Sequence, residues 1–292
     1  MQTAEIMKSF EPIVVEEKPE AVLVVGDVNS TIACGLVAVK LGVKLIHVEA
    51  GLRSFDRTMP EEINRLLTDS ISDVLFCSEP SGVENLRREG VAEDKIHLVG
   101  NVMIDTLLRN REKAEASTIL DALRLNSGRP YAVVTLHRPS NVDDPVMLGR
   151  IMAVLDEIGR EMPVVFPVHP RTRGNLERFG LSLGPNVLLT KPLSYMEFLN
   201  LWKDAALIMT DSGGLQEETT ALGVPCLTLR ENTERPVTID EGSNVLVGTD
   251  PARILEEAAK VLAGQGKQGR RPTLWDGKAA ERIVADLDRL LA

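Results

Sequence analysis

Several features that mark specialised classes of protein are scarce in this 292-residue sequence. Aromatic residues make up only 3%, so the cores must be built from Leu, Val, Ile and Ala. The three cysteines, Cys34, Cys77 and Cys226, lie far apart in apolar contexts. An odd count without paired spacing fits buried reduced thiols, not a disulfide framework or a zinc site. A net charge of −10 argues against a nucleic-acid partner, whose binders usually carry a basic face.

Long apolar segments and the common cofactor motifs are missing as well. No stretch approaches the ~20 apolar residues of a membrane span. Charges interrupt residues 1–20, which contain no signal-peptide core. We therefore expect a cytoplasmic protein without a membrane partner. The sequence has no Walker loop, no dinucleotide fingerprint, no Cys/His metal cluster and no Gly-x-Ser-x-Gly elbow.

Short β-branched runs alternate with longer helical patterns along most of the chain. Ten runs predict buried strands: Ala21–Val25, Lys44–Val48, Val74–Cys77, Ile96–Val99, Tyr131–Thr135, Val164–Val168, Val187–Leu189, Ala206–Met209, Pro225–Leu229 and Val245–Val247. Strands that are apolar on both faces and separated by amphipathic helices indicate parallel sheets covered on both sides. The length favours two domains. We expect an α/β protein with two Rossmann-like, doubly wound domains.

The domain boundary is expected between Asp105 and Pro130, in a polar stretch whose end, 126–130, resembles a helix stop and a turn. We assign residues 1–127 to a partial first domain and 128–272 to the second, with 273–292 a closing helix that packs back on the first. Only about four strands precede this boundary, against six after it. The first domain is therefore poor in strands for a doubly wound fold.

Three carboxylates follow strand ends in the first domain. Asp27 comes after the first strand and Glu49 after the second, while Glu61 opens a helix. Asp27 could simply cap a helix, and acids in a first helical turn also stabilise the helix dipole. Because the carboxyl ends of parallel strands meet at one edge of a sheet, the three should converge there and could supply a base and an acid. His47, in an apolar strand, is better explained as a core residue.

Cationic residues follow strand ends in the second domain. His137 and Arg138 suit an anionic leaving group, because histidine offers a titratable proton and arginine a planar donor fork. His169 with Arg171 and Arg173 forms a second cationic edge, unless these residues are only solvated surface charge.

The most specific local signal is Thr210-Asp211-Ser212-Gly213-Gly214, directly after a buried strand and before a helix. Two glycines let a backbone approach closely, and a helix start offers free N–H groups. Such a site suits a diphosphate, although glycine pairs also serve packing. Glu218, one turn into the helix, could bind a ribose diol. A polar loop containing Arg235 follows the next strand.

At this point the chain resembles a known family, the non-hydrolysing UDP-N-acetylglucosamine 2-epimerases. The motifs that carry the resemblance occur in the family's order: Gly26-Asp27, His47-Val48-Glu49-Ala50-Gly51-Leu52-Arg53, Pro60-Glu61-Glu62-x-Asn64-Arg65, Gly100-Asn101-x-x-Ile104-Asp105, His137-Arg138, Pro167-Val168-His169, Asp211-Ser212-Gly213-Gly214-x-Gln216-Glu217-Glu218 and Thr233-Glu234-Arg235-Pro236. Together they cover essentially the whole chain.

The resemblance implies a GT-B-like fold and a homodimer. It also implies reversible conversion of UDP-N-acetylglucosamine to UDP-N-acetylmannosamine through 2-acetamidoglucal, without an added cofactor or a metal. By motif match, Asp27, Glu49 and Glu61 would be the acid/base carboxylates, and His137 would contact the UDP leaving group beside Arg138. The remaining contacts implied for the UDP-sugar are Phe198 at uracil, Ser212, Gly213 and Gly214 at the diphosphate, Glu218 at ribose, and Arg235.

Two departures from the family pattern are present. Leu193 occupies a position where some members have Gln. The family's opening strand, with its Arg- and Lys-bearing loop, is absent from this sequence. We therefore expect a first domain truncated at its N-terminus. Three alternatives remain: a catalytically impaired UDP-binding module, a GT-B glycosyltransferase, and a hydrolysing relative that releases free N-acetylmannosamine.

Overall fold

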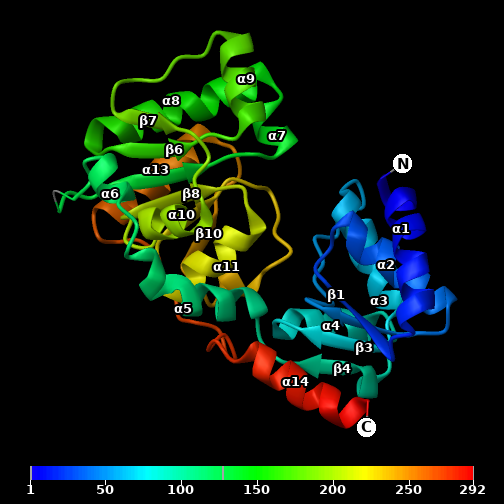
Figure 1. Ribbon diagram of the computed structural model, residues 1–292. Helices are drawn as coiled ribbons and strands as arrows, with labels where there is room; N and C mark the ends of the chain where they lie inside the picture. The colour runs from blue at the N-terminus through cyan, green and yellow to red at the C-terminus, as the bar shows by residue number, and fades with distance from the viewer. Residues whose placement is uncertain (1, 127, 292) are drawn as a thin grey trace. The chain divides into compact units, whose positions relative to one another are not determined.

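The computed structural model describes residues 2–126 and 128–291, and the chain forms two compact units (Figure 1). Unit 1 comprises Met1–Asp105 with Thr273–Ala292, and unit 2 comprises Thr106–Pro272. Each of the ten expected strands forms, with ends within one residue of the prediction. The sheets of both units are parallel, so the expected α/β fold class is confirmed.

Unit 1 is built on a four-stranded sheet in the order β1-β2-β3-β4. The strands are β1 (Ala21–Val25), β2 (Lys44–Val48), β3 (Val74–Cys77) and β4 (Ile96–Leu98). Its helical elements are α1 (Gln2–Glu17), α2 (Asn29–Lys40), α3 (Pro60–Ile71), α4 (Pro80–Arg88), the short η1 (Glu93–Lys95) and α14 (Ala279–Leu290). Because every strand points the same way, the loops after β1 and β2 lie at one edge of the sheet.

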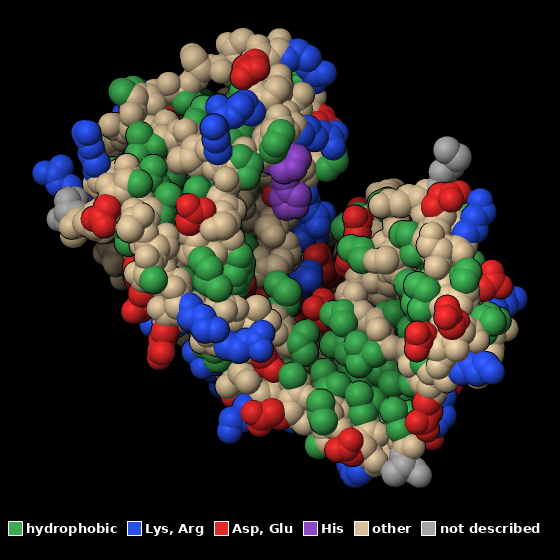
Figure 2. All heavy atoms as spheres, viewed as in Figure 1, with side chains coloured by type: hydrophobic (Ala, Val, Ile, Leu, Met, Phe, Trp, Pro, Cys, Tyr) green, Lys and Arg blue, Asp and Glu red, His purple; other side chains and the backbone are tan. Residues whose placement is uncertain are grey.

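The outer strand of this sheet, β1, is apolar throughout, yet one of its faces is open. Leu23 and Val25 are 44% and 45% exposed, whereas Val24 between them is buried. Figure 2 shows hydrophobic side chains gathered on unit 1 over β1. Parallel sheets are normally covered on both faces, so this edge departs from the general pattern.

The C-terminal segment completes the opposite side of unit 1. The indole of Trp275 is buried and donates to Ser78 O at 2.9 Å. The carboxylate of Asp105 accepts the amides of Ala279 and Ala280 and so caps the start of α14. Ile283 of α14 packs in the core formed by β2, β3 and Val99. The closing helix therefore contributes core side chains as well as surface.

Unit 2 has a six-stranded sheet in the order β10-β9-β8-β5-β6-β7. The strands are β5 (Ala132–Thr135), β6 (Val164–Pro167), β7 (Val187–Thr190), β8 (Leu207–Thr210), β9 (Cys226–Thr228) and β10 (Asn244–Leu246). The chain builds outward from β5 to β7, returns to β8 and builds outward the other way. This is the Rossmann order, and its switch point lies between β5 and β8.

The helices of unit 2 are α5 (Val102–Ala114), which begins in unit 1, α6 (Ile119–Ala122), α7 (Pro139–Val142), α8 (Pro145–Glu161), α9 (Pro170–Phe179), α10 (Tyr195–Trp202), α11 (Gly213–Leu222), α12 (Val237–Asp240) and α13 (Pro251–Leu262). Their starts follow local sequence rules. Asp144 caps α8 by accepting the amide of Met147, and Ser194 with Glu197 forms a capping box on α10.

The division between the units falls at Thr106, at the start of the expected stretch 105–130 and before residue 128, to which the start of the second domain is assigned from sequence. The polar stretch between these positions packs on unit 2, because α6 contacts α10. Asn200 at the end of α10 donates to Ser117 O at 3.0 Å. The sequence of a polar segment does not predict which unit it packs on. Here the contact between α6 and α10 assigns the segment to unit 2.

Cys77 and Cys226 are buried free thiols, whereas Cys34, also free, is only half-buried. Within 2–126 and 128–291, no helix has the length and apolarity required to cross a membrane.

The close contact between Gly100 and the C-terminal segment gives a stability prediction. Gly100 has φ +89°, and a Cβ there would lie 2.1 Å from Leu274 O. Gly90 also has positive φ (+83°), but its Cβ would meet nothing within 4 Å. Gly90→Ala should therefore lower the free energy of unfolding by only about 1 kcal/mol, the cost of a left-handed backbone in a non-glycine residue. Gly100→Ala should lower the free energy of unfolding clearly more, because the backbone of Leu274 must move to make room for the new side chain. Urea unfolding of both variants measures the difference, and equal losses would contradict this account of the C-terminal contact.

Candidate active site

The three carboxylates expected to converge are placed at one edge of the unit 1 sheet. Asp27 lies two residues after β1, Glu49 directly follows β2, and Glu61 is the second residue of α3. A cavity of about 410 Å³ is lined by Asp27, Glu61 and Asn64, together with residues of α1 and the start of α2. Glu49 lies outside this lining, beside Gly26.

Glu49 has an unusual backbone. Its φ is +69°, a left-handed conformation that non-glycine residues seldom adopt. Gly26 also has positive φ, and a Cβ there would lie 3.7 Å from Glu49 Oε2. The carboxylate of Glu49 is thus beside the Gly26–Asp27 turn. Strained backbone of this kind persists only where the surroundings enforce it, and it occurs often at functional sites.

Helix α3 holds Asp27 in place. Arg65 donates from Nε to Asp27 Oδ2 at 3.0 Å, and Asn64 donates to Asp27 O at 2.8 Å. Arg65 also pairs with Glu62 on the same helix. Asp27 therefore does not cap a helix through its side chain. Its carboxylate is one partner of a buried guanidinium.

Glu61 and Glu62, adjacent in sequence, differ in environment. Glu61 is exposed at the cavity, whereas Glu62 is buried and accepts the amides of Ser54 and Phe55, both at 2.9 Å. Burial would raise the pKa of Glu62, but the hydrogen bond from Arg65 and the amide of Ser54 outweigh it and lower that pKa. Glu62 organises the loop before α3, which leaves Glu61 available for chemistry.

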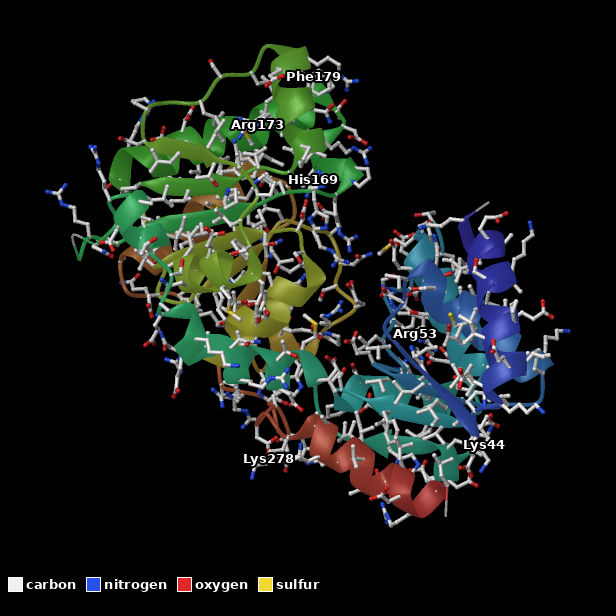
Figure 3. The ribbon with its side chains drawn as sticks, in the orientation of Figure 1. Lys44, Arg53, His169, Arg173, Phe179 and Lys278 are labelled. Atoms are coloured by element: carbon white, nitrogen blue, oxygen red, sulfur yellow. The ribbon has the colours of Figure 1, made fainter. Side chains whose placement is uncertain are left out.

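A buried ionic cluster lies beneath these loops. The ring of His47 contacts Gly26 O at 2.9 Å and Asp69 Oδ1 at 2.6 Å. Asp69 Oδ2 accepts the amide of Gly51 at 3.0 Å and pairs with Arg53 at 2.6 Å. The carbonyl oxygen of Gly26 can only accept, so the ring nitrogen that faces it is a donor. His47 is a core residue, as its sequence context predicts, and Arg53, labelled in Figure 3, belongs to the same cluster.

In unit 2, His137 and Arg138 follow β5 at the switch point of the sheet. Their amides donate to the buried carboxylate of Asp211, which follows β8, at 3.0–3.1 Å. His137 Nδ1 lies 2.8 Å from Asp211 Oδ1. Burial raises the pKa of Asp211, but the His137 side chain, the Arg138 amide and Asn141 outweigh it, so the pKa is lowered overall. Figure 2 shows histidine side chains at the surface of unit 2.

The diglycine segment forms the start of α11, as its sequence predicts. Ser212 is extended at the N-cap position, and its side chain does not cap the helix in the part of the chain that the structure describes. A Cβ on Gly213 would lie 2.6 Å from Arg235 Nη1 and 2.8 Å from Glu234 Oε1. A larger residue there would have to displace the ends of these two side chains, which lie against the helix start. The result is a helix N-terminus with an adjacent guanidinium, which favours an anion.

Arg235 is held by buried carboxylates. It pairs with Glu217 at 2.8 Å through Nε and also with Glu234, which in turn pairs with Arg230 at 2.6 Å. Burial would raise the pKa of Glu234, but Arg235 and Arg230 hold it well below its usual range. This network fixes the orientation of Arg235 without any ligand.

Glu218 and Phe198 lie near a residue that sequence reasoning did not single out. Tyr195, at the start of α10, donates from its hydroxyl to Glu218 Oε1 at 3.0 Å. Phe198 is half-buried one turn further along the same helix, so both aromatic rings share one helix face. Burial, reinforced by Glu217, raises the pKa of Glu218 to about 7, despite the opposing hydrogen bond from Tyr195.

The second cationic edge is largely committed to structural contacts. His169 caps α9 by accepting the amide of Arg171. Arg171 pairs with Asp143, and Arg173 donates to Thr190 O at 2.9 Å. Figure 3 shows His169 at the start of α9 and Arg173 further along it. Both arginines therefore have intramolecular partners, while the side chain of Arg171 stays 51% exposed.

Comparison with known proteins identifies the family. The sequence model of the family described as UDP-N-acetylglucosamine 2-epimerase matches residues 1–288. The UDP-N-acetylglucosamine 2-epimerase of Methanococcus maripaludis is 45% identical over 97% of this chain and 79% of its own. The UDP-2,3-diacetamido-2,3-dideoxy-D-glucuronate 2-epimerase of Pseudomonas aeruginosa is 43% identical over 99% of this chain and 80% of its own.

A solved structure agrees with this assignment. The UDP-GlcNAc 2-epimerase of Methanocaldococcus jannaschii, crystallised with UDP-GlcNAc and UDP, has a TM-score of 0.89 and 42% identity. The match covers 99% of this chain and 81% of that one. The chain belongs to the UDP-N-acetylglucosamine 2-epimerase family.

The raised pKa of Glu218 leads to a prediction about stability and pH. Since the folded-state pKa of about 7 exceeds the ordinary value of 4.5, folding is favoured by the protonated form, and this contribution is lost as pH rises from 4.5 through 7. At pH 8 the buried carboxylate should destabilise the fold by up to ~3 kcal/mol. Glu218→Gln cannot ionise and still accepts from Tyr195.

Glu218→Gln should therefore be more stable than the parent protein in urea at pH 8, with the difference gone at pH 4.5. The exposed Glu177, in α9 of the same unit, provides a control. Glu177→Gln should show no such pH-dependent gain. An equal gain in both variants would mean that net charge, not burial of Glu218, sets the effect.

Proposed function

We propose that this protein interconverts UDP-N-acetylglucosamine and UDP-N-acetylmannosamine by inverting C2 of the sugar. The observation that carries this proposal is that one chain of this family contains two kinds of candidate site, one in each unit. Unit 1 presents carboxylates at a sheet edge, and unit 2 presents a histidine and a diglycine helix start at its switch point. The first group suits proton transfer at carbon, and the second suits a diphosphate.

The reaction divides into elimination and re-addition. A base removes the proton from C2, the electron pair of that C–H bond forms a C1=C2 double bond, and the C1–O bond breaks. UDP leaves with the electron pair of that bond, and the sugar becomes 2-acetamidoglucal. UDP oxygen then attacks C1 while an acid delivers a proton to the opposite face of C2. Atoms and charge balance without an oxidant, a metal or an added cofactor.

The carboxylates of unit 1 are assigned to the proton transfers. Asp27, Glu49 and Glu61 supply the base on one face of C2 and the acid on the other. Arg65 supports this assignment because it fixes the Asp27 carboxylate, and the left-handed backbone of Glu49 supports it because such strain is typical of functional positions.

The residues of unit 2 are assigned to the nucleotide. His137 and Arg138 face the leaving UDP, and Ser212 binds its diphosphate together with the amides of Gly213 and Gly214. Phe198 contacts uracil, Glu218 accepts from the ribose hydroxyls, and Arg235 makes a further contact with the substrate. Preorganised donors of this kind stabilise charge as it develops on the leaving group. A cytoplasmic homodimer, as the family resemblance implies, completes the proposal.

Two observations define alternatives. The relative from Pseudomonas aeruginosa, almost as similar as the one from Methanococcus maripaludis, is named for a different UDP-sugar, so the diacetamido glucuronate derivative is the second candidate substrate. The chain also spans only 79% of the length of the Methanococcus maripaludis relative. Because unit 2 alone contains the candidate nucleotide contacts, a UDP-binding module with impaired catalysis is the second candidate function.

Exchange of the C2 proton tests these alternatives directly. The purified 292-residue chain should incorporate deuterium at C2 of UDP-N-acetylglucosamine in deuterated water and yield the manno isomer by proton NMR. The same assay with the diacetamido glucuronate nucleotide ranks the two substrates. Binding of UDP by calorimetry without exchange of either substrate would favour the impaired module. Free N-acetylmannosamine would indicate hydrolysis, and transfer to an acceptor a glycosyltransferase.

The role of Glu49 gives a further prediction. Glu49→Gln keeps the shape of the side chain but removes its ability to exchange protons. Turnover should fall at least ~10²-fold, while UDP affinity by calorimetry stays nearly unchanged. This variant, purified in the same way, also controls for contaminating host epimerase. A parallel loss of UDP binding would instead assign Glu49 a structural role.

A further inference from the structure

We propose that Asp211 is the positioning residue for His137: it selects the ring tautomer and orientation with which His137 addresses the leaving UDP. This inference rests on the proposed function only for the identity of the leaving group.

The geometry is that of a buried carboxylate behind a surface histidine. The Asp211 side chain is 0% exposed and that of His137 is 51% exposed, and His137 Nδ1 lies 2.8 Å from Asp211 Oδ1. The carboxylate also accepts the amides of His137 and Arg138 and the side-chain amide of Asn141 at 3.0 Å. It therefore fixes the backbone and the ring of His137 together.

The two residues are brought together by the strand order. β5 and β8 are neighbours across the switch point, with Thr135 paired to Thr210 in register. The hydroxyls of these two threonines lie 2.7 Å apart, and Thr210 Oγ1 accepts the amide of Ser212 at 3.0 Å. Movement between the two strand ends is thereby restricted. Asp211 reaches His137 from the residue that directly precedes the diphosphate-binding segment.

The hydrogen bond determines which ring nitrogen is available. Asp211 is ionised and surrounded by donors, so it acts as the acceptor and His137 Nδ1 carries a proton. The other nitrogen, Nε2, is on the far side of the ring from Asp211. In a neutral ring Nε2 holds a lone pair, and in a charged ring it is a donor.

For the elimination step, the charged ring is the useful form. As the C1–O bond breaks, negative charge grows on the phosphate oxygen of UDP, and Nε2–H can donate to it. Asp211 stabilises the imidazolium without taking its proton, as the carboxylate of a Ser-His-Asp triad does. During re-addition the same hydrogen bond weakens as the oxygen forms its bond to C1.

Nitrogen-15 NMR of the histidine rings tests the geometry without reference to activity. The protein has four histidines, and the spectrum of His137→Gln identifies the signals of His137. On titration to the neutral form, His137 should show a protonated Nδ1 and an unprotonated Nε2. Asp211→Asn should abolish this preference. A neutral His137 protonated at Nε2 in the parent protein would overturn the proposal, whether or not the variant folds.

A double-mutant cycle tests the role in turnover. If Asp211 acts through His137, then Asp211→Asn, His137→Gln and the double variant should lower kcat to a similar extent, at least ~10²-fold, with little change in KM. A merely structural role would make the losses add and would raise KM. Additive losses would therefore contradict the proposal.

Asp156 provides the matched control. Its carboxylate accepts the amide of Gly184 at 2.6 Å in the same unit, and no hydrogen bond or ion pair joins it to a candidate site residue within 2–126 and 128–291. Asp156→Asn should leave the His137 signals and kcat unchanged. If the parent protein proves inactive on both UDP-sugars, the proposed function fails while the NMR result still decides whether Asp211 sets the His137 tautomer.

Discussion

One buried carboxylate, that of Asp69 on α3, connects the loops that carry the candidate acid/base residues. Through His47 it is linked to Gly26, which precedes Asp27. Through the Gly51 amide it fixes the chain two residues after Glu49, whose backbone is left-handed. Since α3 also contains Glu61, the three carboxylates share one anchor. Removing one partner of such a buried ion pair typically destabilises by about 3–5 kcal/mol, so the anchor supports both the fold and the chemistry.

In unit 2, a buried carboxylate likewise holds the residues that follow the strands at the switch point. Asp211, also fully buried, gathers two backbone amides, an asparagine and the ring of His137. In each unit a buried aspartate determines how the residues at the strand ends are presented. Low local polarity strengthens these hydrogen bonds and makes a missing partner expensive, so both clusters are stiff before any ligand binds. Such preorganisation is what stabilisation of a charged leaving group requires.

The sequence was sufficient to predict the strands, the fold class and the positions of Asp27, Glu49 and Glu61 at one sheet edge, because apolar runs and strand polarity are local properties. It did not reveal Asp69 or Asp211, since a buried acid in a helix or after a strand looks the same as a solvated one until its partners are known. For the same reason the sequence did not show that Asp143 and Thr190 O accept hydrogen bonds from Arg171 and Arg173. The division at Thr106 depends on how α6 packs on α10, which no periodicity encodes.

The return of Trp275 and α14 to unit 1 affects the order in which the chain can fold during synthesis. Unit 1 begins at the N-terminus but lacks part of its core until residues 273–292 leave the ribosome, after the whole of Thr106–Pro272 has been made. At about 5–20 residues per second this interval lasts roughly ten to thirty seconds. Over that time unit 2 can form its sheet, because its residues are continuous in sequence. The backbone at Gly100, after β4, cannot yet make its contact with Leu274. The core of unit 1 is thus completed after that of unit 2, although residues 1–105 are made first.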